Sequence, residues 1–152
     1  MILIDIGIFE IANGIAVVFS GMAIIVSFYT FYRSKREKSY ADIDCLYLEL
    51  LKLAMQYPKF LDTKNTSNYK NAFKGDDLLR YETYAYISWN ICETIYDRKD
   101  EKLFETWKPV ILAENKLHRK WFDNPENYHK FKDKFRQYIH DNYSQENKKL
   151  NH

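Results

Sequence analysis

Histidine and arginine side chains near the C-terminus have the types and spacing that acid–base chemistry needs. All four histidines fall within the last 35 residues, at His118, His129, His140 and His152. Arg136 and His140 are four residues apart, so a helix would place them on one face. An arginine beside a histidine can bind a phosphodiester and transfer a proton. The alternative is that both are exposed polar residues of a solvated helix.

Two carboxylate–histidine pairs have spacings that occur in metal sites. Glu114 and His118 are four residues apart, and Glu126 and His129 are three apart. A Glu-x-x-His step forms part of di-iron sites in helical bundles, but those sites use it twice, with two further inward glutamates. Glu126 also falls at an expected helix start, where the helix dipole favours a carboxylate. We therefore expect solvated or capping residues here, and no metal.

Basic residues alternate with aromatic rings in two C-terminal segments, KLHRKWF (116–122) and YHKFKDKFRQY (128–138). From residue 116 onward there are nine Lys and Arg but only five Asp and Glu. Cations beside stackable rings are typical of proteins that bind nucleotides or nucleic acids. On this hypothesis the ligand-binding residues are Arg119, Lys120, Arg136 and His140. The alternative is that the rings form a helical core and the charges its wet face, which the helical periodicity also supports.

Motifs for covalent catalysis are missing from the sequence. There is no Gly-rich phosphate loop and no nucleophile elbow. For Ser39 and Ser88, the sequence indicates no catalytic partner. Cys45 and Cys92 lie among apolar residues, so we expect both to be reduced and packed in a core. We expect a protein that is not an enzyme and holds no cofactor.

Helical periodicity dominates the chain after residue 39, and no strand pattern is present. The expected helices cover residues 40–57, 76–97, 101–122 and a last stretch after Pro125. Either Asp76 or Asp77 is suited to cap the second of these helices, and Asn124 the last. Pro109 should kink or split the third helix near Lys108. The polar, Asn- and Thr-rich segment 62–75 should be a long surface loop.

The run from Ile11 to Tyr32 predicts a membrane-spanning helix. Its 22 residues contain no charge, and a helix of that length reaches about 33 Å, against a hydrocarbon core of about 30 Å. A basic cluster that can contact lipid headgroups follows at once, at Arg33, Lys35, Arg36 and Lys38. The positive-inside rule then places the N-terminus outside and the C-terminal domain in the cytoplasm. A cleaved signal peptide is disfavoured because no basic residue precedes the run.

Small residues recur on one face of this run and predict self-association. They are spaced by three or four residues, at Ala12, Ala16, Ser20, Ala23 and Ser27. Such a face lets helices approach closely in lipid, where no hydrophobic force drives them together. The expected partners of the run are therefore the lipid bilayer and other copies of the same helix. The alternative is that Gly, Ala and Ser are simply common in spanning helices.

These patterns predict an all-α protein with one N-terminal transmembrane helix and a cytosolic domain resembling a four-helix bundle. Residues 1–32 should hold a short external tail and the span, and residues 33–39 a basic juxtamembrane linker. Residues 40–144 should form the helical domain, and residues 145–152 a polar tail. The expected location is the inner membrane of a bacterium.

The layout resembles small bacterial single-pass membrane proteins associated with CRISPR systems, whose cytosolic domain is α-helical and HEPN-like. The resemblance rests on the anchor, the basic stop and the C-terminal pattern Trp121-Phe-Asp-Asn124, followed by Phe131 and Phe135. It implies a ring of spanning helices that is gated from the cytosol. HEPN ribonucleases separate their Arg and His by four to six residues, whereas three separate Arg136 from His140, so no catalytic residue carries over.

The leading functional hypothesis is a membrane-anchored homo-oligomeric effector in antiviral defence. Its cytosolic domain would sense a nucleotide, such as a cyclic oligonucleotide, or an RNA-associated partner, and then perturb the membrane. The alternatives are a membrane-tethered scaffold that recruits a protein partner and, with less support, a tethered HEPN-like ribonuclease.

Overall fold

The computed structural model confirms an all-α protein: every element of the described chain is helical. The structure describes the backbone of residues 2–143 and the side chains of residues 19–143. The chain divides into an N-terminal unit, Met1–Asp42, and a C-terminal unit, Ile43–His152. Each unit is described by itself below.

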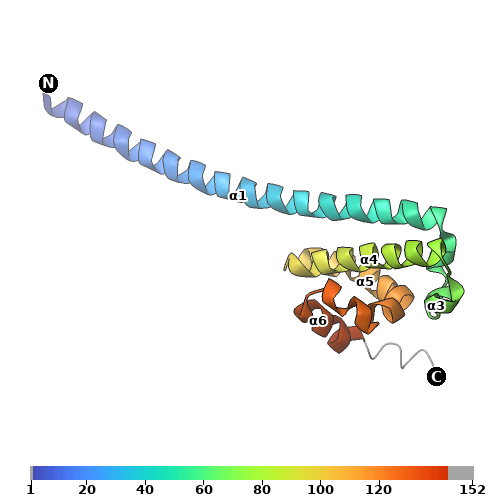
Figure 1. Cartoon of the computed structure of the whole chain (residues 1–152). Coiled ribbons are helices and arrows are strands. Elements are labelled where there is room, and N and C mark those ends of the chain that lie inside the picture. Colours follow the sequence, from blue (N-terminus) through green and yellow to red (C-terminus); the bar gives the residue numbers. More distant parts are fainter. Residues whose placement is uncertain (1, 144–152) are drawn as a thin grey trace. The chain divides into compact units, whose positions relative to one another are not determined.

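Helix α1 is continuous from Ile2 to Gln56 (Figure 1). It includes residues 33–39, so the helix that we expected to begin at residue 40 is the last part of a longer helix. No Gly or Pro occurs between residues 22 and 57, and Lys, Arg and Glu are good helix formers. An ion pair one turn apart, from Nε of Arg33 to Oε1 of Glu37 at 2.9 Å, adds local support. The helix ends where Tyr57, which precedes Pro58, leaves the helical region at φ −128°.

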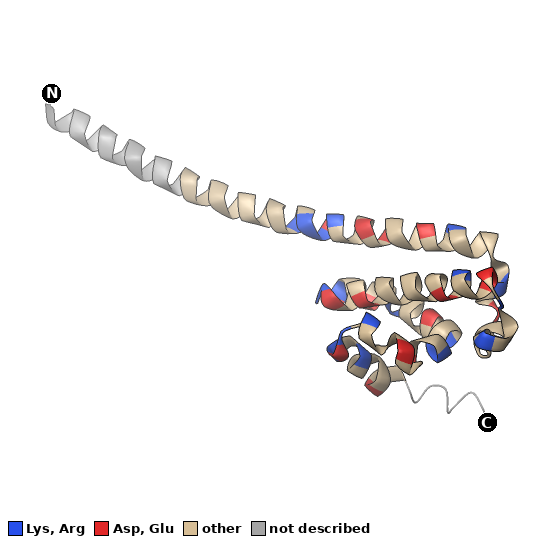
Figure 2. Ribbon diagram, in the orientation of Figure 1, with Lys and Arg blue, Asp and Glu red and all other residues tan. Residues whose placement is uncertain are grey.

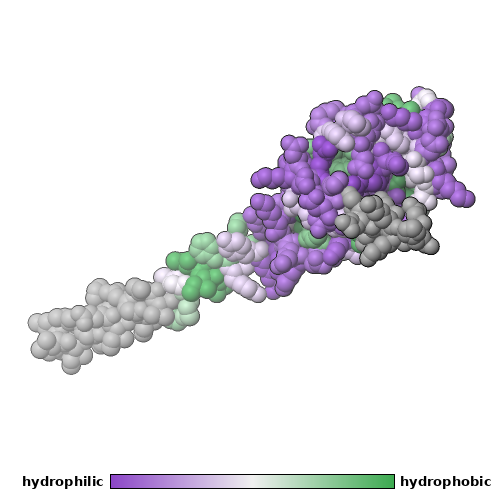
Figure 3. All heavy atoms as spheres, turned by 90° about the horizontal axis from the view of Figure 1, so that it is seen from below, coloured by the Kyte–Doolittle hydropathy of each residue, from purple (hydrophilic) through white to green (hydrophobic). Residues whose placement is uncertain are grey.

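In the N-terminal unit, large apolar side chains of α1 are exposed. Ile24, Ile25 and Val26 are consecutive, so they point in directions about 100° apart, yet each is 57–69% exposed. Among the residues of this unit whose side chains are described, charge begins at the basic cluster (Figure 2). Hydrophobic atoms gather on the described part of the unit before that cluster (Figure 3). Among the residues that the structure describes, no helix is long and apolar enough to cross a membrane. The first part of the predicted span, residues 11–18, has its side chains outside the described residues.

The segment after α1 is not the surface loop that its polar composition predicted. It forms a 3₁₀ helix, Pro58–Leu61, and two short helices, α2 (Thr63–Thr66) and α3 (Tyr69–Ala72). Tyr69 and Phe73 are four residues apart and both are buried, as is Phe60. Their rings surround Tyr81, with the closest ring centroids 4.7 Å apart. Burial of these three aromatic side chains therefore orders the segment in spite of its polar composition.

Helix α4, Asp76–Asp97, has the bounds that the sequence predicted and buries one face from Tyr81 to Ile95. Its N-cap is Gly75, not Asp76 or Asp77 as we expected. Gly75 adopts φ 52° and ψ −129°, a conformation that side chains with a Cβ rarely take. The two aspartates lie in the first turn, where the helix dipole favours them, and Asp77 pairs with Nζ of Lys59 at 2.5 Å.

Helix α5, Glu101–Phe122, begins after a turn in which Lys99 has φ 50°. The side chain of Asp100 caps it by accepting a hydrogen bond from the Leu103 backbone N–H at 3.0 Å. Pro109 lies inside this helix without splitting it, so that part of our expectation is wrong. Buried side chains at Trp107 and Ile111, on either side of the proline, hold the helix in place.

The last helical stretch is divided into two elements, not one as we expected. Asn124 does cap the first, a 3₁₀ helix over Pro125–Lys130, and Phe131 is then extended at φ −133°. Helix α6 follows over Asp133–Tyr143. The division is stabilised by Glu93 of α4, which accepts the Lys132 backbone N–H at 2.7 Å.

Replacing Asp100 by Ala should lower the free energy of unfolding by about 1 kcal/mol, because one backbone N–H of α5 loses its cap. Asp100→Asn should stay close to wild type, because an asparagine oxygen caps equally well. Chemical denaturation of the full chain measures both. Equal losses in the two variants would show that the charge of Asp100, and not its cap, stabilises the helix.

Candidate functional site

Four polar side chains meet in the core between α4 and α5. Ser88 and Tyr81 come from α4, and Glu114 and His118 from α5. All four are at most 4% exposed. We expected Glu114 and His118 to be solvated or to cap a helix end, and that expectation is wrong. We name this group the buried polar cluster.

Short contacts connect the cluster. The Ser88 hydroxyl donates to Oε2 of Glu114 at 2.5 Å, and the Tyr81 hydroxyl lies 3.2 Å from Nδ1 of His118. Nε2 of His118 lies 3.5 Å from Oε2 of Glu114, which is longer than a good hydrogen bond. When Tyr81 donates to Nδ1, the remaining ring N–H of neutral His118 is the one nearest to this carboxyl group.

Burial sets the protonation of the cluster. It lowers the pKa of His118 to about 3, because a buried imidazolium loses its hydration. It raises the pKa of Glu114, and the hydrogen bond from Ser88 opposes this increase. Burial also raises the pKa of Tyr81 well above its ordinary value. The imidazole is therefore neutral at pH 7, and the Tyr81 phenol keeps its proton.

The order of contacts in the cluster differs from that of a serine hydrolase. A nucleophilic serine needs the histidine as its immediate base, with the carboxylate beyond it. Here Ser88 bonds directly to Glu114, and His118 lies on the other side of the carboxyl group. The serine is also fully buried. This geometry supports a structural role. Each hydrogen bond joins α4 to α5 and satisfies a polar group in the core.

A signal for this cluster was present in the sequence. Glu114 and His118 continue the buried face of α5, which is spaced by four, three, four and three residues through Trp107, Ile111 and Trp121. A polar residue in phase with such a face is buried with its apolar members, and it then needs a partner on a facing helix.

The predicted ligand-binding residues of α5 have different surroundings. Arg119 donates to Oδ2 of Asp123 at 2.7 Å and to Oδ1 of Asn115 at 3.0 Å, so its charge is largely neutralised within its own helix. Lys120, the next residue, is exposed. Since Arg119 is engaged by these partners, we regard Lys120 as the more accessible cation of the two.

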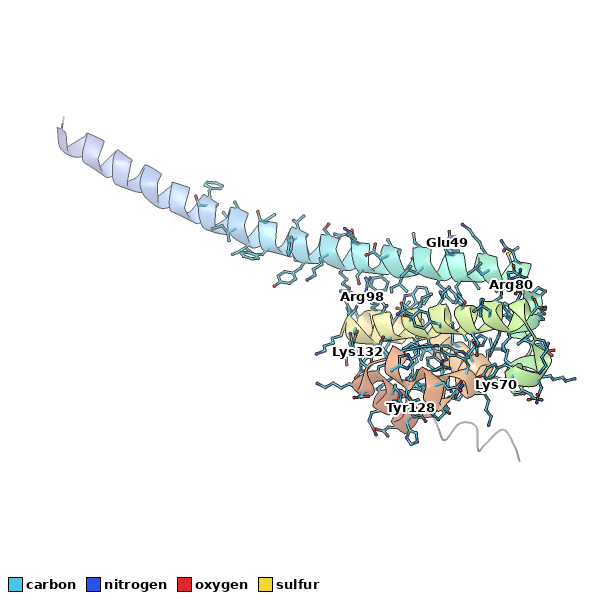
Figure 4. All side chains as sticks on the ribbon, viewed as in Figure 1. Glu49, Lys70, Arg80, Arg98, Tyr128 and Lys132 are labelled. Atoms are coloured by element: carbon cyan, nitrogen blue, oxygen red, sulfur yellow. The ribbon has the colours of Figure 1, made fainter. Side chains whose placement is uncertain are left out.

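Arg136 stacks on an aromatic ring at the surface. Its guanidinium carbon lies 3.5 Å from the ring centroid of Tyr128. Tyr128, which Figure 4 labels, is 39% exposed. Among the described residues, no hydrogen bond or ion pair engages the guanidinium, which leaves its N–H donors available. His140 of the same helix is exposed and lies beside Asp141. None of these contacts joins Arg136 to His140.

Lys130 makes a similar contact nearby in the sequence. Its Nζ lies 4.9 Å from the centroid of the Trp121 ring and donates to Oδ1 of Asn127 at 2.7 Å. Trp121 is fully buried, so this ring serves the core. Part of the basic and aromatic pattern is therefore structural, and the Arg136–Tyr128 pair is the part that solvent can reach.

Residues assigned to the membrane are exposed wherever their side chains are described. This holds for the basic cluster of Arg33, Lys35, Arg36 and Lys38, and for Ser20, Ala23 and Ser27 of the small-residue face. Ala12 and Ala16 have side chains outside the described residues. Cys45 is also exposed, which corrects our expectation of a core cysteine, whereas Cys92 is buried as expected.

No protein-family model matches this chain, and neither the curated proteins nor the solved structures give a significant match. The resemblance to CRISPR-associated membrane proteins therefore stays a prediction. Within the described residues, no group of three or more His, Cys, Asp or Glu side chains is placed to hold a metal ion.

The buried imidazole predicts a specific loss of stability in acid. Because the pKa of His118 is about 3 when folded and near 6.5 when unfolded, only the unfolded chain binds its proton between these values. The stability from His118 is complete above pH 6.5 and falls by up to about 1.4 kcal/mol per pH unit as the pH approaches 3. Glu114 has the opposite sign, since its raised pKa removes stability as the pH rises above 4.5.

The variant His118→Gln separates the two effects. Its free energy of unfolding should fall less steeply than that of wild type between pH 6.5 and pH 4, as measured by urea denaturation at each pH. The matched control is His140→Gln, which replaces an exposed histidine outside the buried polar cluster. Parallel slopes for wild type and His118→Gln would contradict the account.

Proposed function

We propose that this protein is a membrane-anchored, self-associating effector in which α1 spans the bilayer and the helical C-terminal unit binds an anionic ligand. The observation that carries the proposal is the uncharged run 11–32 within one continuous helix, followed at once by a basic cluster. The N-terminus would lie outside, and the C-terminal unit in the cytoplasm.

Exposure of apolar side chains supports the anchor. A helix in water keeps one polar face, whereas Ile24, Ile25 and Val26 are all exposed although they point in different directions. Burying each of these side chains is favourable by about 1.5–3 kcal/mol. Lipid chains satisfy this demand around the whole helix, and the exposed Arg33 and Lys35 that follow would meet anionic headgroups.

The Arg136–Tyr128 pair supports a nucleotide-like ligand. A guanidinium held flat on a ring presents its N–H donors at the edge, where they match a phosphate group in a bidentate manner. The exposed part of the Tyr128 ring offers a surface for a base. We therefore propose a cyclic oligonucleotide or an RNA-associated partner as the ligand.

The physiological setting comes from the resemblance described above. It implies that ligand binding in the cytosol would be coupled to a change in a ring of spanning helices, as part of antiviral defence. Recruitment of a protein partner to the inner face of the membrane is the alternative, and it would not require the nucleotide binding that is tested below.

The anchor is tested by flotation of the full chain with liposomes of bacterial lipids, followed by alkaline carbonate extraction. Wild type should float and resist extraction. The double variant Ile24→Arg/Ile25→Arg should be extracted, because each central arginine costs about 2.5–3.5 kcal/mol on insertion. Leu46→Arg is the control and should float, because it lies outside the run. Extraction of wild type would refute the anchor.

Ligand binding is tested with cyclic tetra-adenylate on the detergent-solubilised full chain by calorimetry. Arg136→Ala should weaken binding at least about tenfold, in line with the loss of a charged hydrogen bond, and added salt should weaken wild-type binding. Lys134→Ala removes the same charge from the same helix and should change little. Equal effects of the two variants, or no binding at all, would remove the nucleotide ligand.

A further inference from the structure

Two carboxylate side chains of α4 contact the residue that begins α6, Lys132 (labelled in Figure 4). Oε1 of Glu93 accepts a hydrogen bond from the Lys132 backbone N–H at 2.7 Å. Asp97, one turn further along α4, accepts a hydrogen bond from Nζ of the same lysine. Glu93 is buried, whereas Asp97 lies at the surface. The buried carboxylate therefore holds the backbone of Lys132, and the surface carboxylate holds only its ammonium group.

The backbone of Lys132 connects Glu93 to Arg136. Lys132 immediately precedes α6, and its carbonyl oxygen accepts the Arg136 backbone N–H at 3.0 Å. A residue in this place has its carbonyl group in the helix but not its N–H, so the N–H needs another partner. Glu93 is that partner. Fixing Lys132 therefore fixes the first turn of α6, and with it the position from which the Arg136 side chain extends.

Tyr128, the other half of the stacked pair, is held by a different helix. It belongs to the 3₁₀ helix that precedes Phe131, where Nδ2 of Asn127 donates to the Trp121 backbone carbonyl of α5 at 2.7 Å. Phe131 lies between the two attachments and is extended and buried. The stacking of Arg136 on Tyr128 therefore requires one attachment to α5 and another to α4.

We propose that Glu93 is a positioning residue for the Arg136–Tyr128 pair, because it holds the start of α6 through Lys132 and so places the guanidinium over the ring. This inference rests on the proposed function, since it assigns a role in ligand binding to a residue that does not touch the ligand. A guanidinium that is already held in place loses less side-chain freedom when a phosphate group binds to it.

Nuclear magnetic resonance of the detergent-solubilised full chain, labelled with nitrogen-15 at arginine, tests the placement without any ligand. The guanidinium carbon of Arg136 lies 3.5 Å from the Tyr128 ring centroid, so the ring current should shift its Nε–H proton upfield. Arg136→Ala identifies the signal, and Tyr128→Leu should abolish the shift. Glu93→Ala should lose most of the shift, because a methyl group cannot reach Lys132. Glu93→Gln should retain it, because an amide oxygen can accept the same N–H.

Asp97→Ala is the matched control. It removes a carboxylate from the same helix, one turn away, that contacts only the exposed ammonium group of Lys132. Surface ion pairs of this kind contribute little, so the upfield shift should stay at its wild-type value. Glu93→Ser is measured beside Glu93→Ala, because serine also falls short of Lys132 but keeps a polar group at this position.

Calorimetry with cyclic tetra-adenylate then connects the placement to binding. Glu93→Ala should weaken binding at least about fivefold, because a hydrogen bond to a charged acceptor no longer fixes the start of α6. Glu93→Gln and Asp97→Ala should bind with an affinity close to that of wild type. Rescue by glutamine would show that the accepted N–H, and not the charge of Glu93, is what positions Arg136.

The outcomes separate this inference from the proposed function. Wild-type affinity in a folded Glu93→Ala or Glu93→Ser variant, with or without the upfield shift, would overturn the positioning role and leave the proposed ligand intact. A wild type that binds no nucleotide would overturn the proposed ligand and the role of Glu93 in binding together. Failure of both short variants to fold would also overturn the positioning role, because Glu93 would then support the whole core.

Discussion

Exposed apolar side chains on all sides of one continuous helix are the constraint on which this structure depends. Water is a poor solvent for Ile24, Ile25 and Val26, and no rotation of the helix could place all three against a single protein surface. The proposed membrane anchor would resolve this conflict, because lipid chains would surround the helix on all sides. On that proposal, the basic cluster at Arg33 would lie at the membrane surface.

The C-terminal unit buries two ionisable side chains among aromatic rings. Glu114 and His118 would each be costly alone in a core. Ser88 and Tyr81 supply partners from the facing helix, and both burial-driven pKa changes favour neutral forms. The cluster thereby joins α4 to α5 with directional contacts that apolar packing alone does not provide. These contacts therefore specify which faces of the two helices pack together.

Sequence periodicity was enough to predict the bounds of α4 and α5, because each helix has apolar residues at helical spacing along its whole length. Periodicity failed where local composition and tertiary packing favour different structures. The polar composition of residues 62–75 concealed Tyr69 and Phe73, whose rings pack against Tyr81 of α4. Arg136 was recognised from its type, but its stacking on Tyr128 depends on the extended residue Phe131 between two helices, which local propensity does not reveal.

Hydrogen–deuterium exchange of the full chain in lipid nanodiscs tests the central claim most directly. If α1 spans the bilayer, backbone amides of residues 11–32 should remain protected for hours, because hydrocarbon excludes water from their helical hydrogen bonds. Amides of residues 33–42, in the same helix but outside the bilayer, should exchange much sooner. Equal exchange in the two segments would contradict a membrane-spanning α1.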